Sequence, residues 1–144
     1  MKNQFLEKPT ADDIMEIGRH FLLRDAVIVI DYNDIRDVLE GAENAVVLTG
    51  KASGSNRCAD AIEDAVLHTC SVADGFNFFS ANKCLLYIYC PKDSPMLMSE
   101  NEAINTFFDM FHNDIMLKWG LAEKENMHDM LITIIASNLH KSKM

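Results

Sequence analysis

Residues 26–35 read Ala-Val-Ile-Val-Ile-Asp-Tyr-Asn-Asp-Ile, an apolar run that ends abruptly in two carboxylates and then takes on the pattern of a helix. The apolar part is too short for a helix, so it predicts a buried connector or a brief strand. Asp31 suits the N-cap of the following helix and Asp34 its N3 position, because both carboxylates would lie at the positive end of the helix dipole. The same two carboxylates are also candidates for a functional site, and the pattern leaves both roles open.

Helix signals flank this run on both sides. Thr10 followed by Asp13 is typical of a helix start, and apolar residues at helical spacing extend that helix over about residues 11–23. After the run, a short helix is expected over residues 31–40, and Gly41 is suited to its C-terminal cap.

Four further segments have the apolar and β-branched content of strands, and helices separate them. They cover residues 44–50, 83–90, 114–120 and 130–136. The last is the most β-prone and is expected at the centre of the sheet, whereas residues 123–126 predict a loop. The pattern predicts an α+β or α/β sandwich, in which a four-stranded sheet is packed by helices.

Two more helices are expected between these strands. Ser55 is placed to cap a helix over residues 56–68 with a close-packing, Ala-rich face, and a further helix is predicted over 100–112. Arg57 has the wrong charge for a helix N-terminus, so we expect it to bind a nearby carboxylate or carbonyl rather than a ligand. The aromatic cluster Phe76–Phe79 is interpreted as a lid on the core, with a ligand site or an exposed interface as alternatives.

Composition argues against several classes of function. With Lys+Arg 13 against Asp+Glu 22, the formal net charge of −9 lacks the basic surface that nucleic acids and anionic membranes require. The length of 144 residues fits one domain over residues 1–144. No apolar run approaches the ~20 residues that span a bilayer, and no signal peptide is visible at the N-terminus, so we expect a cytoplasmic protein.

Motifs for cofactor chemistry are missing from the sequence. Neither G-x-x-x-x-G-K-S/T nor G-x-G-x-x-G occurs, and there is no G-x-S-x-G. The four cysteines include no C-x-x-C pair, which predicts small buried thiols and no metal site, with Cys84 and Cys90 on the same core-facing side of a strand. We therefore expect no cofactor and assign no catalytic residue.

Two longer motifs resemble one known family. Residues 26–35 resemble the stretch G-L-I-N-L-D-F-A-D-V, which follows the long central helix of FtsZ, the bacterial relative of tubulin. Residues 50–58 read Gly-Lys-Ala-Ser-Gly-Ser-Asn-Arg-Cys and resemble that family's G-x-A-S-G-x-N-R-A. Ala61 and Ala65 stand at the positions of its following alanines.

Three shorter motifs continue the match in the same order and spacing. Asn101-Glu102-Ala103 is similar to the family's N-E-A, Trp119-Gly120 to its F-G, and residues 132–137 to its V-T-V-I-A-T. The resemblance covers about residues 11–139 and only the C-terminal half of FtsZ.

The resemblance implies a domain layout. Residues 11–25 would form a helix corresponding to the end of FtsZ's central helix, and residues 26–139 would form a domain like the FtsZ C-terminal domain. We expect a stand-alone version of that domain, without the GTPase domain and without the partner-binding tail.

The resemblance also implies a role for the acidic residues. In FtsZ the corresponding loop enters the nucleotide site of the next subunit in a filament, where two aspartates position or polarise the attacking water and an asparagine contacts the nucleotide. Asp31 and Asp34 match those aspartates, whereas Val29 stands at the asparagine position and Ala26 at the glycine position. Valine cannot supply the hydrogen bonds of an amide, so the loop keeps its acidic pair and loses a polar contact.

The sequence therefore predicts a non-catalytic, FtsZ-like protein of bacterial cell division that acts by protein–protein interaction. The candidate partner-binding residues are Val29, Asp31, Asn33 and Asp34. The expected partner is FtsZ or an FtsZ-like GTPase. The chain would not bind GTP alone and would at most complete a partner's GTPase site in trans.

Two alternatives remain open at this stage. One is a small ligand-binding protein or enzyme that reuses the fold, since the FtsZ C-terminal domain is similar in fold to a trimeric chorismate mutase. The other is a self-associating structural module. An apolar pocket with convergent polar groups would favour the first, and an exposed acidic loop would favour docking.

Overall fold

The computed structural model describes residues 2–21 and 26–142. In chain order its elements are β1 (Gln4–Glu7), α1 (Ala11–His20), β2 (Ala26–Ile28), α2 (Tyr32–Leu39), β3 (Asn44–Ala52), α3 (Arg57–Leu67), α4 (Thr69–Val72), β4 (Phe76–Asn77), β5 (Lys83–Pro91), α5 (Asn101–Asp109), β6 (Met116–Lys124), β7 (Met130–Ser137) and β8 (His140–Lys141). Short 3-10 helices lie at Phe78–Ser80 and Met98–Glu100.

The main sheet has six strands rather than the four predicted from the sequence. Its strand order is β1-β3-β7-β5-β6-β2, and a separate two-stranded sheet joins β4 to β8. The two additional strands are the edges: β1 pairs antiparallel with β3, and β2 pairs antiparallel with β6. β1 has four residues and β2 has three, which is too short to show an alternating pattern in the sequence. Each forms a strand by pairing with a longer neighbour, β3 or β6.

The strand predicted at the centre of the sheet, β7, is central. It lies between β3 and β5 and runs antiparallel to both. β5 and β6 are parallel neighbours, as expected for strands joined through a helix, here α5. The predicted loop over residues 123–126 is wrong at its start, because β6 stays paired with β5 as far as Lys124.

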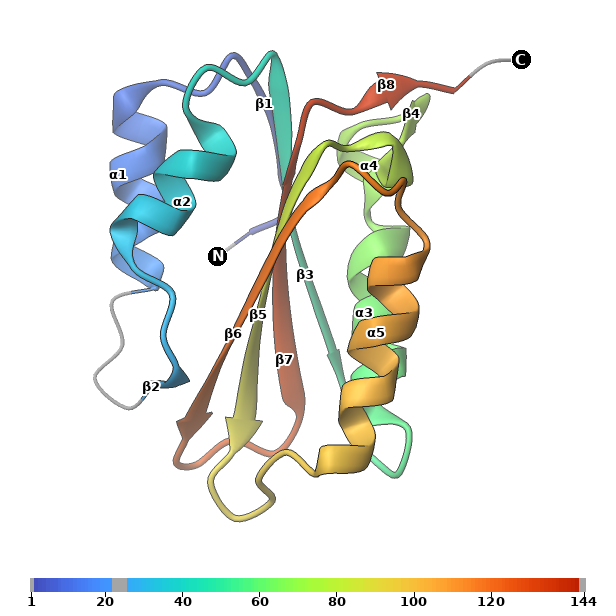
Figure 1. Cartoon of the computed structure of the whole chain (residues 1–144). Helices are drawn as coiled ribbons and strands as arrows, with labels where there is room; N and C mark the ends of the chain where they lie inside the picture. The colour runs from blue at the N-terminus through green and yellow to red at the C-terminus, as the bar shows by residue number, and fades with distance from the viewer. Residues whose placement is uncertain (1, 22–25, 143–144) are drawn as a thin grey trace.

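Helices cover both faces of the sheet (Figure 1), with α1 and α2 on one face and α3 and α5 on the other. Alternate residues of each strand therefore enter two different cores. In β5, Cys84 and Cys90 enter the core under α3 and α5, as predicted, whereas Leu85 and Tyr87 enter the core under α1 and α2. The fold is the predicted mixed sheet packed by helices.

The aromatic cluster packs into the core under α3 and α5. Phe78 is buried, and its ring lies 6.0 Å from that of Phe107 and 5.6 Å from that of Phe111. Phe76 and Phe79 are partly buried against the same core. The interpretation of these phenylalanines as a cover on the core is confirmed.

Three helix ends test the predicted capping. Thr10 forms a capping box with Asp13 at the start of α1, and Asp31 forms one with Asp34 at the start of α2. The predicted cap by Ser55 is wrong, because the N-cap of α3 is Asn56 and a backbone hydrogen bond from Arg57 to Gly54 closes the turn instead.

The helix expected over 11–25 ends at His20, and residues 22–25 lie outside the described residues.

Helix α3 lies directly on the backbone of β3 at a glycine. A Cβ placed on Gly50 would meet the carbonyl oxygen of Ala61 and would lie 2.5 Å from the Ala65 nitrogen. Ala61 and Ala65 are fully buried, so the predicted close packing of the alanine-rich face is confirmed. Because the opposing atoms belong to helix backbone, a side chain at this position has no room.

Replacing Gly50 with valine is therefore expected to lower the free energy of unfolding by about 3 kcal/mol, since overpacking here must move a helix backbone. Denaturant unfolding followed by circular dichroism measures the loss. Thr49→Val on the same strand is the control, and it should cost about 1 kcal/mol or less because it removes only a hydroxyl contact to Asn3. Equal losses in the two variants would contradict the close packing.

Candidate functional site

The residues highlighted by the sequence lie in one short stretch, residues 26–34, which we call the β2–α2 segment. It consists of the edge strand β2, a connection and the first turn of α2. β2 pairs with β6 through Ala26 opposite Ala122 and Ile28 opposite Leu121, with a register shift between the two pairs. The segment is therefore attached to the sheet at one end and to a helix at the other.

A glycine of β6 determines how closely the segment approaches the sheet. A Cβ at Gly120 would lie 2.5 Å from Ile30 Cγ1 and 2.9 Å from the carbonyl oxygen of Ile28. Ile30 is buried in the core under α1 and α2. A glycine within a strand often marks such a close backbone approach, and here it allows Ile30 to anchor the segment.

The two aspartates are brought together by the capping box of α2. Asp31 Oδ1 accepts from the Asp34 backbone N–H at 3.1 Å, and Asp34 Oδ2 accepts from the Asp31 N–H at 2.9 Å. Each carboxylate satisfies the other residue's backbone donor, which fixes both side chains. The structure thus confirms the predicted N-cap role of the pair.

Lys118 of β6 makes an additional contact that the sequence did not reveal. Its ammonium group donates to Asp34 Oδ1 and forms an ion pair with it. Burial alone would raise the pKa of Asp34, but the hydrogen bonds from Lys118 and the Asp31 backbone and the lysine's charge outweigh burial and lower that pKa. Each oxygen of Asp34 therefore accepts a hydrogen bond, whereas Asp31 is exposed.

The apolar half of the segment is exposed. The prediction of a buried connector is wrong for Val27, Ile28 and Val29, and Val27 and Val29 are 57% and 65% exposed. The alternative prediction, a brief strand, describes β2 correctly. Tyr32 is also exposed, and its ring lies next to Gly18 of α1, where a Cβ would be 3.1 Å from Cδ2. We call Val27, Ile28, Val29 and Tyr32 the apolar strip.

Of the four predicted partner-binding residues, three are on the surface. Val29, Asp31 and Asn33 are exposed, while Asp34 is half-buried beneath its ion pair. The structure joins Asp31 and Asp34 by hydrogen bonds and places Val29 in the apolar strip beside them.

Arg57 occupies the role predicted for it. Its guanidinium donates to both carboxylate oxygens of Glu100 at 2.9 Å and to the carbonyl oxygens of Ser94 and Pro95 at 2.9 and 3.1 Å. The hydrogen bond with Glu100 raises the pKa of Arg57, and the same bond lowers the pKa of Glu100. Arg57 thus fastens the start of α3 to the loop before α5 and is not available to a ligand.

The cysteines form no reactive pair. Burial raises the pKa of Cys58 to about 12 and of Cys90 to about 11, so both remain thiols at neutral pH and are poor nucleophiles. Cys84 is buried as well, whereas Cys70 is exposed, so the expectation of buried thiols is wrong for Cys70. It lies in α4, a helix of four residues with too little apolar periodicity to predict its orientation.

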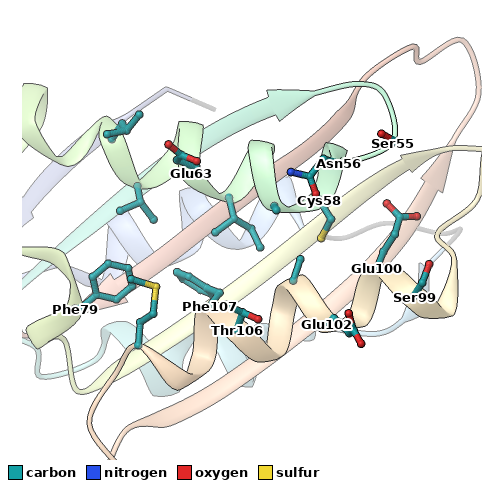
Figure 2. Close-up of a pocket in the computed structure, with 16 residues that line it drawn as sticks. Ser55, Asn56, Cys58, Glu63, Phe79, Ser99, Glu100, Glu102, Thr106 and Phe107 are labelled. Carbon is teal, nitrogen blue, oxygen red and sulfur yellow. The ribbon is translucent and has the colours of Figure 1, made fainter.

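A groove of about 760 Å³ lies on the opposite face of the sheet from the β2–α2 segment, between α3 and α5. Figure 2 shows Cys58 and Glu63 reaching it from α3 and Glu102, Thr106 and Phe107 from α5. We call it the α3–α5 groove. The aliphatic and aromatic residues of its lining make it mostly apolar.

Residues 2–21 and 26–142 contain no cluster of three or more His, Cys, Asp or Glu side chains arranged to hold a metal ion. Within the same ranges, no helix has the length and apolar character needed to cross a membrane.

Comparison with known proteins decides the fold. The chain is 26% identical over 117 residues to the cell division protein FtsZ of Porphyromonas gingivalis, a match that covers 81% of this chain and 25% of that protein. Among solved structures, the FtsZ dimer of M. jannaschii superposes with a TM-score of 0.69 at 17% identity, covering 93% of this chain and 43% of that one. The chain has an FtsZ-like fold.

Another solved structure, of TubZ, shares the FtsZ-like fold. GDP-form protofilaments of TubZ from Bacillus thuringiensis serovar israelensis match with a TM-score of 0.65 at 12% identity, over 81% of this chain and 31% of that chain. No protein-family model matches. The chain spans about a quarter of the length of the curated FtsZ it resembles, so the comparison concerns part of that protein.

Replacing Lys118 with glutamine is expected to raise the pKa of Asp34, because the variant loses both the charge and the ammonium donor. An NMR pH titration of the Asp34 carboxyl carbon measures the shift. Lys92→Gln, which breaks a separate ion pair with Glu125, is the matched control and should leave Asp34 unchanged. Identical titration of Asp34 in wild type and Lys118→Gln would show that the ion pair does not form in solution.

The lowered pKa of Asp34 also makes the stability of the folded chain depend on pH. A carboxylate with a lowered pKa in the folded state stabilises the fold above its ordinary pKa, and this contribution disappears as the pH falls through the lowered value. At neutral pH the Lys118→Gln variant should lose up to about 1 kcal/mol, because Lys118 is 47% exposed and solvent screens the pair. In acid the two proteins should converge.

Proposed function

We propose that the chain acts by docking its β2–α2 segment onto an FtsZ-type GTPase and so modulates filament assembly in bacterial cell division. The observation that carries the proposal is that the apolar strip is exposed on a backbone held in place from both sides. Its partner-binding residues would be Val29, Asp31 and Asn33, with Asp34 as the residue that holds the loop.

The apolar strip supports a protein partner. A contiguous exposed apolar surface beside polar groups is characteristic of interaction sites, whereas single exposed apolar side chains are common on any protein. In this segment Val27, Ile28 and Val29 are consecutive and exposed, and Tyr32, the first residue of α2, is exposed as well. Removing this strip from water on docking provides the favourable free energy, and Asp31 at its margin provides orientation.

Rigidity of the segment also favours docking. Ile30, between Val29 and Tyr32, is buried and so is Ile35 after Tyr32, and the capping box fixes the turn between the two isoleucines. A surface that is already in its bound conformation loses little conformational entropy on binding. An exposed acidic loop of this kind was the feature expected to favour docking over small-molecule chemistry.

The state of Asp34 supports a non-catalytic role. A carboxylate that activates water must be basic enough to attract a proton from it. Each oxygen of Asp34 already accepts a hydrogen bond, from Asp31 or Lys118, and its pKa is lowered, so Asp34 is a weak base. Val29 adds an apolar side chain where the resemblance implies an asparagine. The segment is thus better suited to occupying a partner's site than to completing it.

The choice of partner comes from the relatives. The solved structures with the same fold include an FtsZ dimer and TubZ protofilaments, so this fold occurs in proteins that self-associate. An FtsZ-type subunit is the natural partner for a segment that resembles the inserted loop of that family. Such a partner would also place the chain in the cytoplasm.

A chorismate-mutase-like activity is less well supported. The α3–α5 groove is lined by Glu63, Glu100 and Glu102, and its described lining residues include no lysine or arginine. The nearby Arg57 forms an ion pair with Glu100. A dicarboxylate substrate would meet negative charge without a cation to bind it.

Sedimentation with GTP-assembled FtsZ from the organism that encodes the chain tests the proposal. We expect the wild-type chain to pellet with the polymer and to change the rate of GTP hydrolysis. A combined Val27→Ser and Val29→Ser variant should lose at least about tenfold in affinity, since each removed side chain contributes on the order of 1 kcal/mol of apolar burial. Asp31→Ser should weaken binding while keeping the helix capped, because serine is also a good N-cap.

Met110→Ser and Glu102→Gln on the opposite face are the matched controls, and both should bind FtsZ as the wild type does. Absence of co-sedimentation together with an unchanged polymer and GTPase rate would refute the proposal. Equal loss in the strip variants and the controls would also refute it. If the chain forms homo-oligomers that the strip variants abolish, the segment is a self-association surface instead.

A further inference from the structure

We infer that the α3–α5 groove is a second docking surface, which binds an amphipathic helical segment of a partner protein with an apolar face and basic flanks. The proposal is independent of the β2–α2 segment, because the groove lies on the other face of the sheet (Figure 1).

The lining of the groove is suited to an apolar helix face. Ile62 and Phe107 form part of an apolar floor, and the small side chains of Ala59 and Ala103 leave room for another backbone to approach. A helix that lays its apolar face into a groove of this kind is a recurring mode of protein recognition.

One end of the groove exposes further apolar side chains. Leu67 on α3 and Met110 just after α5 both line it and are 63% and 58% exposed. Helices α3 and α5 have 11 and 9 residues, so at 1.5 Å per residue the groove extends for roughly 15 Å, about three turns of a bound helix.

Charge determines which helix would bind. Glu63 of α3 and Glu102 of α5 line the groove, and so does Glu100, directly before α5. Glu100 is paired with the buried Arg57, so Glu63 and Glu102 supply the negative charge at the margins. The groove therefore has acidic margins, which attract lysine and arginine side chains and repel anionic ligands.

The helix dipoles of α3 and α5 add to this negative charge at one end of the groove. The two helices run side by side in the same direction (Figure 1), so their C-terminal ends, with partial negative charge, lie at the end of the groove that holds Leu67 and Met110. Neither helix has a basic residue in its last turn. A cationic flank of the bound helix is thus expected at that end.

Other occupants fit less well. A second copy of the chain docking groove to groove would bring two acidic helix pairs together, and like charges facing each other oppose association. A small anionic metabolite would face the same repulsion. The groove's apolar floor and acidic margin together select a cationic amphipathic partner.

Binding of a model peptide tests the inference. The probe is a fluorescein-labelled 14-residue peptide of leucine and lysine in an amphipathic helical pattern, and the control peptide replaces each lysine with glutamate. We expect the lysine peptide to bind the full chain and the glutamate peptide not to bind. Glu63→Gln combined with Glu102→Gln should weaken binding about tenfold and reduce its salt dependence.

Filling the groove is the second arm of the test. Ala103→Phe should block the peptide, and Leu67→Ser with Met110→Ser should weaken it even if the larger substitution disturbs the fold. Val29→Ser and Asp12→Asn, which lie off the groove, are the controls and should bind normally. On peptide addition, NMR shifts should occur at Ile62, Ala103 and Thr106.

Three results would overturn the inference. They are equal binding of the two peptides, peptide-induced shifts centred on α2 rather than on the groove, and dimerisation that disappears in Leu67→Ser with Met110→Ser. The Val29→Ser control also keeps this inference separate from the proposed FtsZ docking, since each surface can fail without the other.

Discussion

The close approach of residues 28–30 to the backbone of Gly120 determines where the candidate site is presented. With hydrogen in place of a side chain at Gly120, Ile30 enters the core under α1 and α2, and the adjoining Val29 is left facing solvent. The capping box of Asp31 and Asp34 then starts α2 at a fixed point, and Lys118 holds the second carboxylate. Gly120, the capping box and the ion pair of Lys118 with Asp34 thus hold the backbone of an apolar run whose side chains are exposed.

The two-sided sheet separates the molecule's two candidate surfaces. Strand residues alternate between two cores, so the face covered by α1 and α2 and the face covered by α3 and α5 are built from different side chains of the same strands. The β2–α2 segment belongs to the first face and the α3–α5 groove to the second. Substitutions on one surface are therefore expected to leave the other intact, which allows each to act as the control for the other.

Sequence patterns predicted the parts of the fold that depend on local signals. The caps at Thr10 and Asp31, the centrality of β7 and the shared face of Cys84 and Cys90 follow from neighbouring residues and strand alternation. The edge strand β1 was missed and β2 was predicted only as one of two alternatives, because pairing partners decide edge strands. Lys118 was missed because its partner Asp34 lies 84 positions away, with no local pattern to link them. Val27, Ile28 and Val29 were predicted to be buried because they are hydrophobic. They lie at an edge of the sheet, where apolar side chains can remain exposed to solvent.

Amide hydrogen–deuterium exchange of the chain, with and without GTP-assembled FtsZ, tests most directly whether the β2–α2 segment is the docking surface. The prediction is that assembled FtsZ slows exchange at the amides of residues 26–35 and leaves those of α3 and α5 unchanged. Unchanged exchange at residues 26–35, in a chain that does bind the polymer, would contradict it.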